Sequence, residues 1–322
     1  MWRLSLVALV GILASSCQSD ATVTAPTTAA IAFPSSSSTV STTAPDLPAP
    51  DLPTPDVASF DSAAGIAAVL NAAERGIRDR GLSPDETARW GRVQQRAYRA
   101  LTNHAEWDAA VRDRIGSDVQ IAFDRNVEAR RAVADHASTK PAGEPSVTLP
   151  AWTIVDPLPA PQLLGYYREA ESATGVPWQY LAAINVVETR VGRIVGASSS
   201  GAVGPMQFLP STWSSCCVGD VQDPHDSILG AATYLVSRGA PIDMIAALRG
   251  YNPNDGYVGA VDAYARNMIA DERAFFGYHA WEVYVSTSAG SVRLPVGYSS
   301  PEPADAVAYV ATHPQDLAPV ND

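Results

Sequence analysis

Apolar side chains recur at helical spacing between residues 60 and 139. They repeat every three or four positions, which is the period of one face of an α-helix, and the repeat includes Trp90, Val93, Ala97 and Leu101. Ser83 is followed by Pro84, and Glu86 lies three positions further on. This arrangement is typical of a helix start, where Ser caps the first turn and Glu bonds back to it. Residues 60–139 are therefore predicted to form a helical region.

A second helical pattern extends from residue 160 to about residue 280, with short connections. Leu163, Leu164, Tyr167 and Ala170 share one face of the first predicted helix. The next predicted helix begins at Pro177, carries apolar residues on most of its surface and ends near Glu188. Together the two regions predict a mainly α fold.

Other segments have different patterns. Residues 281–300 alternate apolar and polar positions around a Ser-Ala-Gly turn, which predicts a β-hairpin. Residues 140–159 are rich in Pro, Ala and Thr and are predicted to be a linker. Residues 301–322 are rich in Pro and acidic residues, so we expect a poorly ordered tail.

The N-terminus indicates export. Arg3 precedes a short apolar run at residues 4–13, which is too short to span a bilayer and typical of a secretory signal peptide. The small residues before Cys17 resemble the lipobox of bacterial lipoproteins, so residues 1–16 are predicted to be removed and Cys17 to be lipidated. The lipid would anchor the protein to the outer face of the cytoplasmic membrane. An ordinary leader with an incidental cysteine, giving a secreted protein, is the alternative.

Residues 17–59 consist mostly of Ser, Thr, Ala, Pro and Val. Such a composition cannot bury enough apolar surface to fold, so it predicts a disordered tether.

Composition and charge narrow the function classes. Hydrophobic residues make up 46% of the 322 positions, which is enough for a core, and the net charge of -12 argues against nucleic acid as a partner. No Cys or His group has the spacing of a metal site, and no cofactor motif is found, so neither a metal nor a cofactor is expected. Cys216 and Cys217 are adjacent. They could form a vicinal disulfide or remain two thiols.

Glu188 is the candidate catalytic residue. It follows the apolar segment YLAAINVV, and a carboxyl group among apolar side chains is expected to have a raised pKa. A raised pKa suits a general acid that works near neutral pH. The alternative is a glutamate at a helix end that pairs with Arg190 or Arg193.

Three motifs in order favour the catalytic interpretation. Glu188-Thr189, the loop Gly204-Pro205-Met206-Gln207 with FLPSTW after it, and Tyr251-Asn252 together resemble the soluble lytic transglycosylase domain, which is related in fold to goose-type lysozyme. The resemblance covers about residues 160–276, and Pro205 stands where Leu is commoner. It implies a lysozyme-like catalytic domain at residues 160–280.

The resemblance also implies a reaction and a set of residues. The family cleaves the β-1,4 bond between N-acetylmuramic acid and N-acetylglucosamine in peptidoglycan and leaves 1,6-anhydro-muramic acid ends. Glu188 would act first as acid and then as base. The residues implied to bind glycan strands are Ser198, Met206, Gln207, Tyr251 and Asn252.

Two alternatives remain open. A lysozyme-like hydrolase on the same fold would use water and a second carboxylate, for which the sequence offers Asp223, Asp226, Asp255 and Asp262. Of these, Asp226 is better explained as a helix cap and Asp262 as a surface residue of a helix. A non-catalytic wall-binding lipoprotein is the other alternative, and the intact motifs argue against it.

Overall fold

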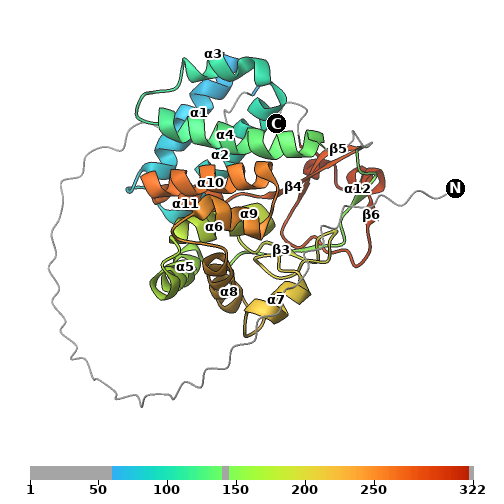
Figure 1. Cartoon of the computed structure of the whole chain (residues 1–322). Helices are drawn as coiled ribbons and strands as arrows, with labels where there is room; N and C mark the ends of the chain where they lie inside the picture. The colour runs from blue at the N-terminus through green and yellow to red at the C-terminus, as the bar shows by residue number, and fades with distance from the viewer. Residues whose placement is uncertain (1–59, 140–144, 319–322) are drawn as a thin grey trace, which may run out of the picture. The chain divides into compact units, whose positions relative to one another are not determined.

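The computed structural model describes residues 60–139 and 145–318, with side chains excluded at residues 134–139. Within these ranges the protein is mainly helical and has only short antiparallel strand pairs (Figure 1). This confirms the mainly α prediction. The signal peptide, the tether and Cys17 lie outside the described residues. No helix in the described ranges is both long and apolar enough to cross a bilayer.

Four helices form the N-terminal helical region. Their bounds are α1 Ala63–Arg78, α2 Pro84–Asn103, α3 Asp108–Arg112 and α4 Gln120–Thr139. Helix α2 starts as predicted, because the Ser83 side chain accepts a hydrogen bond from Glu86 N while the Glu86 carboxylate accepts one from Ser83 N. A short 3-10 turn at Ala105–Trp107 connects α2 to α3.

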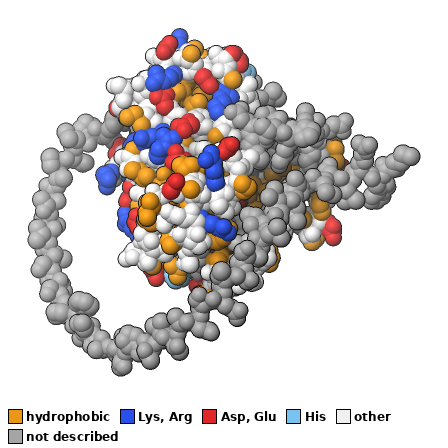
Figure 2. Space-filling view, in the orientation of Figure 1, with side chains coloured by type: hydrophobic (Ala, Val, Ile, Leu, Met, Phe, Trp, Pro, Cys, Tyr) orange, Lys and Arg blue, Asp and Glu red, His pale blue; other side chains and the backbone are white. Residues whose placement is uncertain are grey.

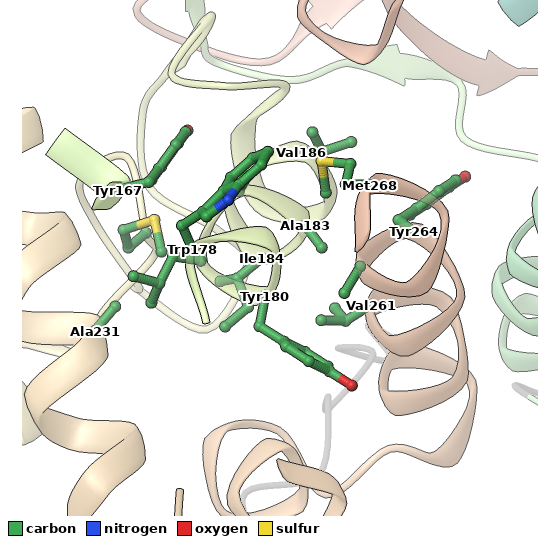
Figure 3. Packing of buried hydrophobic residues seen from close by; sticks show 14 of the residues in the cluster. Tyr167, Trp178, Tyr180, Ala183, Ile184, Val186, Ala231, Val261, Tyr264 and Met268 are labelled. Carbon is green, nitrogen blue, oxygen red and sulfur yellow. The ribbon is translucent and has the colours of Figure 1, made fainter. Parts of the chain in front are cut away.

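Seven helices follow in the second region. They are α5 Ala160–Thr174, α6 Trp178–Thr189, α7 Pro210–Cys216, α8 Pro224–Ser237, α9 Met244–Tyr251, α10 Asp255–Ala270 and α11 Arg273–His279. Helix α6 lies at the centre of a large apolar cluster, with Val261, Tyr264 and Met268 of α10 on one side and Ala231 of α8 on the other (Figure 3).

Helix α4 lies antiparallel to α10 and joins the two helical regions. Arg125 near the start of α4 donates to the carbonyl of Arg266 near the end of α10. Ala132, about two turns further along α4, approaches Gly259 near the start of α10. Because Ala129 of α4 belongs to the same apolar cluster as α6 and α10, the N-terminal region shares a core with the second region.

A buried polar network also joins the regions. Glu74 of α1 is completely buried and accepts hydrogen bonds from Gln94, Tyr98 and Asn126, besides an ion pair with Arg78. Two further side chains extend the network into the second region: Tyr278 donates to Asn126 and Trp281 donates to Gln94. A satisfied polar network of this kind fixes one arrangement of the elements around it.

The strands form three antiparallel pairs. Strands β4 Val283–Thr287 and β5 Gly290–Leu294 make the predicted hairpin. Strand β2 Thr153–Ile154 pairs with β3 Ile194–Val195, and β1 Thr148–Leu149 pairs with β6 Ala304–Asp305.

The predicted linker and tail are therefore structured where they are described. Strands β1 and β2 lie in the predicted linker, while β6, helix α12 Ala306–Thr312 and a 3-10 turn at Pro314–Asp316 lie in the predicted tail. Leu149 and Ala306 are buried in an apolar cluster with the β4–β5 hairpin. The sequence pattern missed these elements because each is short and takes its stability from partners far along the chain.

Arginine side chains lie among Asp and Glu side chains on the face shown in Figure 2, rather than in one block. Several arginines of the described residues form ion pairs, for example Arg131 with Asp108 and Arg266 with both Glu128 and Asp262. The mixed pattern is that of an ordinary solvated surface.

Candidate active site

Glu188 lies in the last turn of α6, just before an unusual helix end. Helix α6 is buried along most of its length. Its last residue, Thr189, is followed by Arg190 and Val191, which both have left-handed backbones with φ of 54° and 57°. Two successive non-glycine residues in this conformation are uncommon, and such backbones concentrate at functional sites. The turn redirects the chain directly after Glu188.

The Glu188 carboxyl group has a strongly altered acidity. Its side chain is mostly surrounded by protein and keeps a partial opening to solvent. Burial raises the pKa of Glu188 from 4.5 to about 7, and the Tyr257 hydroxyl acts in the opposite direction. Glu188 forms no ion pair with Arg190 or Arg193: the Arg190 guanidinium bonds to the Val186 carbonyl, and Arg193 faces Asp156 at 3.9 Å. The carboxyl group is therefore partly protonated near neutral pH, as a general acid must be.

Two tyrosines from different elements approach the site. Tyr257 of α10 is buried, and although its hydroxyl influences Glu188, it completes no hydrogen bond of normal geometry within the described part of the chain. Tyr251, at the end of α9, stacks parallel to Tyr257 with ring centroids 6.5 Å apart. Its hydroxyl donates to the Met206 carbonyl at 2.6 Å. The Tyr257 hydroxyl thus acts on the Glu188 carboxyl, and Tyr251 holds the neighbouring loop.

A buried hydrogen-bond network fixes the loop at residues 204–207 to α6. Asn185 is one helical turn before Glu188 and donates to the Pro205 carbonyl at 2.8 Å and to the Thr189 hydroxyl at 3.1 Å. Thr189 also donates to the Pro205 carbonyl, at 2.6 Å, and Tyr167 of α5 donates to the Asn185 side-chain oxygen at 2.6 Å. All these donors are buried and paired, so the loop and Glu188 hold a fixed relative position.

Position 204 requires glycine because the Val221 carbonyl lies against it. A Cβ atom at Gly204 would lie 2.0 Å from the Val221 carbonyl oxygen, and φ is +78°. Only glycine fits such a position without displacing the backbone. The close approach at Gly204 is therefore to Val221 of the protein itself.

Gln207 has an unfavourable backbone conformation and lies at the edge of the loop. Its φ is 52°, in the left-handed region. Its side-chain amide donates to the carbonyl of Gly204 at 3.0 Å and lies 3.4 Å from that of Gly196. The side chain is partly exposed to solvent.

The other predicted binding residues differ in how exposed their side chains are and in the hydrogen bonds they form. The Met206 side chain is fully buried, so it supports the loop from inside and cannot line a cleft, contrary to the prediction. The Ser198 hydroxyl accepts hydrogen bonds from Ala202 N at 3.0 Å and from Ser200 N at 3.3 Å, which is typical of a turn.

Asn252 is partly exposed and its side chain accepts a hydrogen bond from Asn254 N at the start of α10. Asn252 thereby sets the turn between α9 and α10.

Sequence reasoning missed Asn185 and Tyr167, which had no motif to mark them. Two further aromatic residues of the region are Trp213 and Tyr257. Both rings are buried in an aromatic cluster, in which Trp213 packs edge-on against Phe208. Cys216 and Cys217 form a vicinal disulfide at the end of α7.

The candidate second carboxylates have other partners. Asp223, rather than the predicted Asp226, caps α8, and Asp226 accepts from Asp220 N. Asp262 accepts from Tyr180 and pairs with Arg266, while Asp255 pairs with Arg249. The influences on the pKa of Glu188 are burial and the Tyr257 hydroxyl, and none of the candidate aspartates is among them.

The possible metal ligands also have structural roles. Asp223, His225 and Asp226 offer atoms within 4.8 Å of one another, the one such group found in the described ranges. Asp223 and Asp226 already accept backbone hydrogen bonds at the start of α8, and His225 faces Glu169. The group is explained by helix capping and surface pairing.

A cavity of about 320 Å³ borders the loop on the side of the Asn185 network. Segments 155–158 and 191–196 line most of it, together with Asn185, Gly204 and Pro205. Glu188 is not among the lining residues, so the cavity adjoins the loop contact rather than the carboxyl group.

Replacing Asn185 with Ala should lower activity more than its effect on stability explains. The change leaves the Tyr167 hydroxyl without its acceptor and removes one link to Pro205, at a cost of about 1–3 kcal/mol. Because a misplacement of about 1 Å at a reacting group can cost about 100-fold in rate, we expect kcat to fall by about 10- to 100-fold. Measurements of kcat and Tm on the same variant test this.

Asn71→Ala is the matched control. Asn71 bonds to the carbonyls of Ala67 and Arg114 and accepts from Gly116 N in the N-terminal region. It should lower Tm and leave kcat unchanged. Equal effects of both variants on kcat would contradict a positioning role for Asn185.

Comparison with known proteins supports the motif assignment. Residues 165–273 match the family described as the transglycosylase SLT domain. The chain is also similar to membrane-bound lytic murein transglycosylase F of Thiobacillus denitrificans (strain ATCC 25259 / T1), with 27% identity over 147 residues. This alignment covers 43% of the chain and 31% of the relative, so the chain spans about a third of that protein's length. No solved structure matches the chain.

Proposed function

The chain contains a transglycosylase SLT domain at residues 165–273, and on that premise we propose that it is a peptidoglycan lytic transglycosylase with Glu188 as its catalytic residue. The observation that carries the proposal is the half-buried Glu188 carboxyl with a pKa of about 7 beside the loop that holds Gln207. A carboxyl with this pKa can give and take a proton near neutral pH.

The proposed reaction uses Glu188 twice. Protonated Glu188 first donates its proton to the glycosidic oxygen, and the C1–O bond to N-acetylglucosamine breaks. The Glu188 carboxylate then takes the proton of the muramic acid C6 hydroxyl, whose oxygen bonds to C1 and closes the 1,6-anhydro ring. The proton returns to Glu188 and no water is consumed. Gln207, Tyr251 and Asn252 border the sugars, and the Tyr257 hydroxyl acts on the reacting carboxyl.

The observations favour this role over the two alternatives. A hydrolase with two carboxylates would need a second one about 5–9.5 Å from the first, and the candidate aspartates are engaged in caps or ion pairs. A scaffold protein would have no use for a carboxyl with a pKa of about 7.

We also propose that the protein works in the cell envelope, anchored through lipid at Cys17, with residues 17–59 as its tether. The matched relative is named as membrane-bound, and the signal-like N-terminus of this chain is consistent with the same location. Growth in labelled palmitate followed by purification tests the anchor, because Cys17→Ala should remove the label.

Product analysis tests the reaction. The full chain is incubated with purified peptidoglycan, and the soluble products are measured by mass spectrometry without reduction. Products with 1,6-anhydro-muramic acid ends support the proposal. Products heavier by one water, with reducing ends, would establish a hydrolase instead, and binding without release of products would favour a scaffold.

The pH dependence of kcat/KM should follow Glu188. Because the first step needs the protonated carboxyl, kcat/KM is expected to fall about tenfold per pH unit above the Glu188 pKa of about 7. The Tyr257 hydroxyl lowers this pKa, so Tyr257→Phe should move the alkaline limb to higher pH. Initial rates from pH 5 to 9 measure both.

Tyr180→Phe serves as the control for this shift. The Tyr180 hydroxyl donates to Asp262 and has no influence on Glu188, so its alkaline limb should coincide with that of the wild type. A limb that stays in place in Tyr257→Phe would show that Tyr257 does not act on the catalytic carboxyl.

A further inference from the structure

Trp152 is a partly exposed tryptophan that lies ahead of the SLT domain. It belongs to the segment predicted as a linker and precedes the matched residues 165–273. Most tryptophans of the described residues are buried, whereas Trp152 and Trp107 keep part of their surface open to solvent. A tryptophan with an exposed ring and a bonded N–H is typical of binding surfaces, so the contacts of Trp152 indicate what it serves.

The backbone of residues 152–154 is held on both edges. Strand β2 pairs with β3 on one edge. On the other edge, Ser300 N donates to the Trp152 carbonyl at 3.0 Å and Ile154 N donates to the Tyr298 carbonyl at 2.8 Å. Trp152 therefore projects from a strip of chain that is fixed between the SLT domain and the C-terminal segment.

The Trp152 indole packs against the loop that follows β3. Its Nε1 donates to the Ala197 carbonyl at 3.3 Å. A Cβ atom at Gly196 would lie 2.6 Å from the Trp152 Cδ1 atom, so the lack of a side chain there lets the ring lie directly on the backbone. Trp152 N also donates to the Pro150 carbonyl at 2.9 Å. All polar atoms of Trp152 are thus bonded, and the carbon surface of the ring is what it offers to a ligand.

This loop also connects Trp152 to two residues implied to bind glycan. The carbonyl of Gly196, on whose backbone the ring lies, is 3.4 Å from the Gln207 side-chain amide. Ser198 directly follows Ala197, whose carbonyl the indole bonds, and is partly exposed. One backbone residue therefore separates the Trp152 ring from Gln207, and the ring adjoins the residue before Ser198. A sugar held by Gln207 would have Trp152 beside it.

The faces of an N-acetylhexosamine suit such a ring. In β-1,4-linked hexosamines the hydroxyl and amide groups lie around the rim, and the axial C–H groups make each face apolar. An indole offers a large flat apolar surface of matching shape. Because hydrogen bonds already fix the ring and its backbone, little conformational entropy is lost when a sugar binds.

We propose that Trp152 is a further glycan-binding residue, on whose indole ring an N-acetylhexosamine next to the one at Gln207 stacks. This inference rests on the proposed function. It extends the substrate cleft beyond the SLT domain, onto residues 150–155 and the C-terminal segment 297–300 that holds them. Because the ring contacts Gly196 and Ala197, its sugar lies away from the bond that breaks, and the contact should contribute to affinity rather than to the chemical step.

Affinity measurements test the subsite. Trp152→Ala in the full chain should raise KM for purified peptidoglycan about tenfold and change kcat little. Chitohexaose binding to Glu188→Gln, measured by calorimetry, should weaken by about the same factor when Trp152→Ala is added. Trp152→Phe keeps a flat ring and should recover most of the affinity.

Trp107→Ala is the matched control. Trp107 is a partly exposed tryptophan of the N-terminal region, stacked on His104 with ring centroids 3.9 Å apart. Its replacement should leave both KM and chitohexaose affinity unchanged. An equal loss of affinity in Trp107→Ala and Trp152→Ala would show that the loss reflects stability, and it would overturn the subsite.

Tryptophan fluorescence gives a readout that a purely structural role would not move. Chitohexaose stacked on Trp152 should change the emission of Glu188→Gln, and most of this change should be absent when Trp152→Phe is added, although the sugar still binds. This comparison decides the proposal even if Trp152→Ala does not fold. An emission change of the same size in both forms, including none in either, would overturn the subsite, as would unchanged affinity in folded Trp152→Ala. Absence of anhydro products from the wild type would instead overturn the proposed function, and the chitohexaose measurements would still decide whether Trp152 binds sugar.

Discussion

Glu188→Gln is expected to abolish the release of 1,6-anhydro products from peptidoglycan. General acid–base catalysis contributes about 100- to 10,000-fold to a rate. Because the same carboxyl serves in both proposed steps, we expect a loss at or beyond the upper end of that range. Glutamine keeps the shape of the side chain but can neither donate nor accept the proton. Product formation by mass spectrometry is the measurement, with substrate binding followed in parallel.

Stability measurements show whether the loss reflects chemistry. Between pH 4.5 and 7 the native carboxyl keeps a proton that the unfolded chain has released, so the wild-type protein loses stability as the pH rises through this window. Glutamine does not ionise, and the variant should be at least as stable as the wild type at pH 8. Glu302→Gln, at an exposed position, is the matched control and should retain full activity. Substantial anhydro products from Glu188→Gln would rule out Glu188 as the acid and base.

Glu74→Ala is expected to destabilise the whole described fold, although Glu74 lies outside the SLT domain. The change leaves Arg78 without its buried partner and removes the acceptor shared by Gln94, Tyr98 and Asn126. Breaking a buried pair by removing one partner costs about 3–5 kcal/mol. For a protein of this size that corresponds to a fall in Tm on the order of 10 °C. Calorimetry and urea unfolding measure it.

The unfolding curve also tests how the two helical regions are coupled. If they share one core, Glu74→Ala should lower the midpoint of a single transition, and activity should be lost in step with it. Glu106→Ala, an exposed glutamate of the same region that pairs with His104, should leave the midpoint near that of the wild type. Separate transitions for the two regions would contradict a shared core.

The catalytic assignment could be predicted from sequence because its signals are local. Glu188 follows an apolar helix, which marks its carboxyl as one at risk of burial, and the end of that helix depends on residues within a few positions of it. The three motifs are short and lie in order, so they point to one domain without knowledge of its structure. The capping pair Ser83 and Glu86 likewise fixed the start of α2, since a helix cap involves neighbours three residues apart.

The interpretation of single residues within the motifs was less certain. Met206 belongs to the loop motif, but only the structure shows that its side chain is buried in the core and that its carbonyl accepts a hydrogen bond from the Tyr251 hydroxyl. A motif identifies which residues recur and not which atoms face a ligand. Asn185 is the converse case: it holds the loop to α6 but lies in an apolar helix pattern that gave no reason to select it.

The sequence by itself determined the mainly α class, the two helical regions, the hairpin and the candidate catalytic glutamate, because periodicity, caps and motifs act over short separations. Tertiary structure alone decided that the two regions share a core and that β1 and β6 pair across more than 150 residues. These features depend on contacts between residues far apart along the chain. Burial and the pairing of charges there are set by which elements pack together, which no local pattern records.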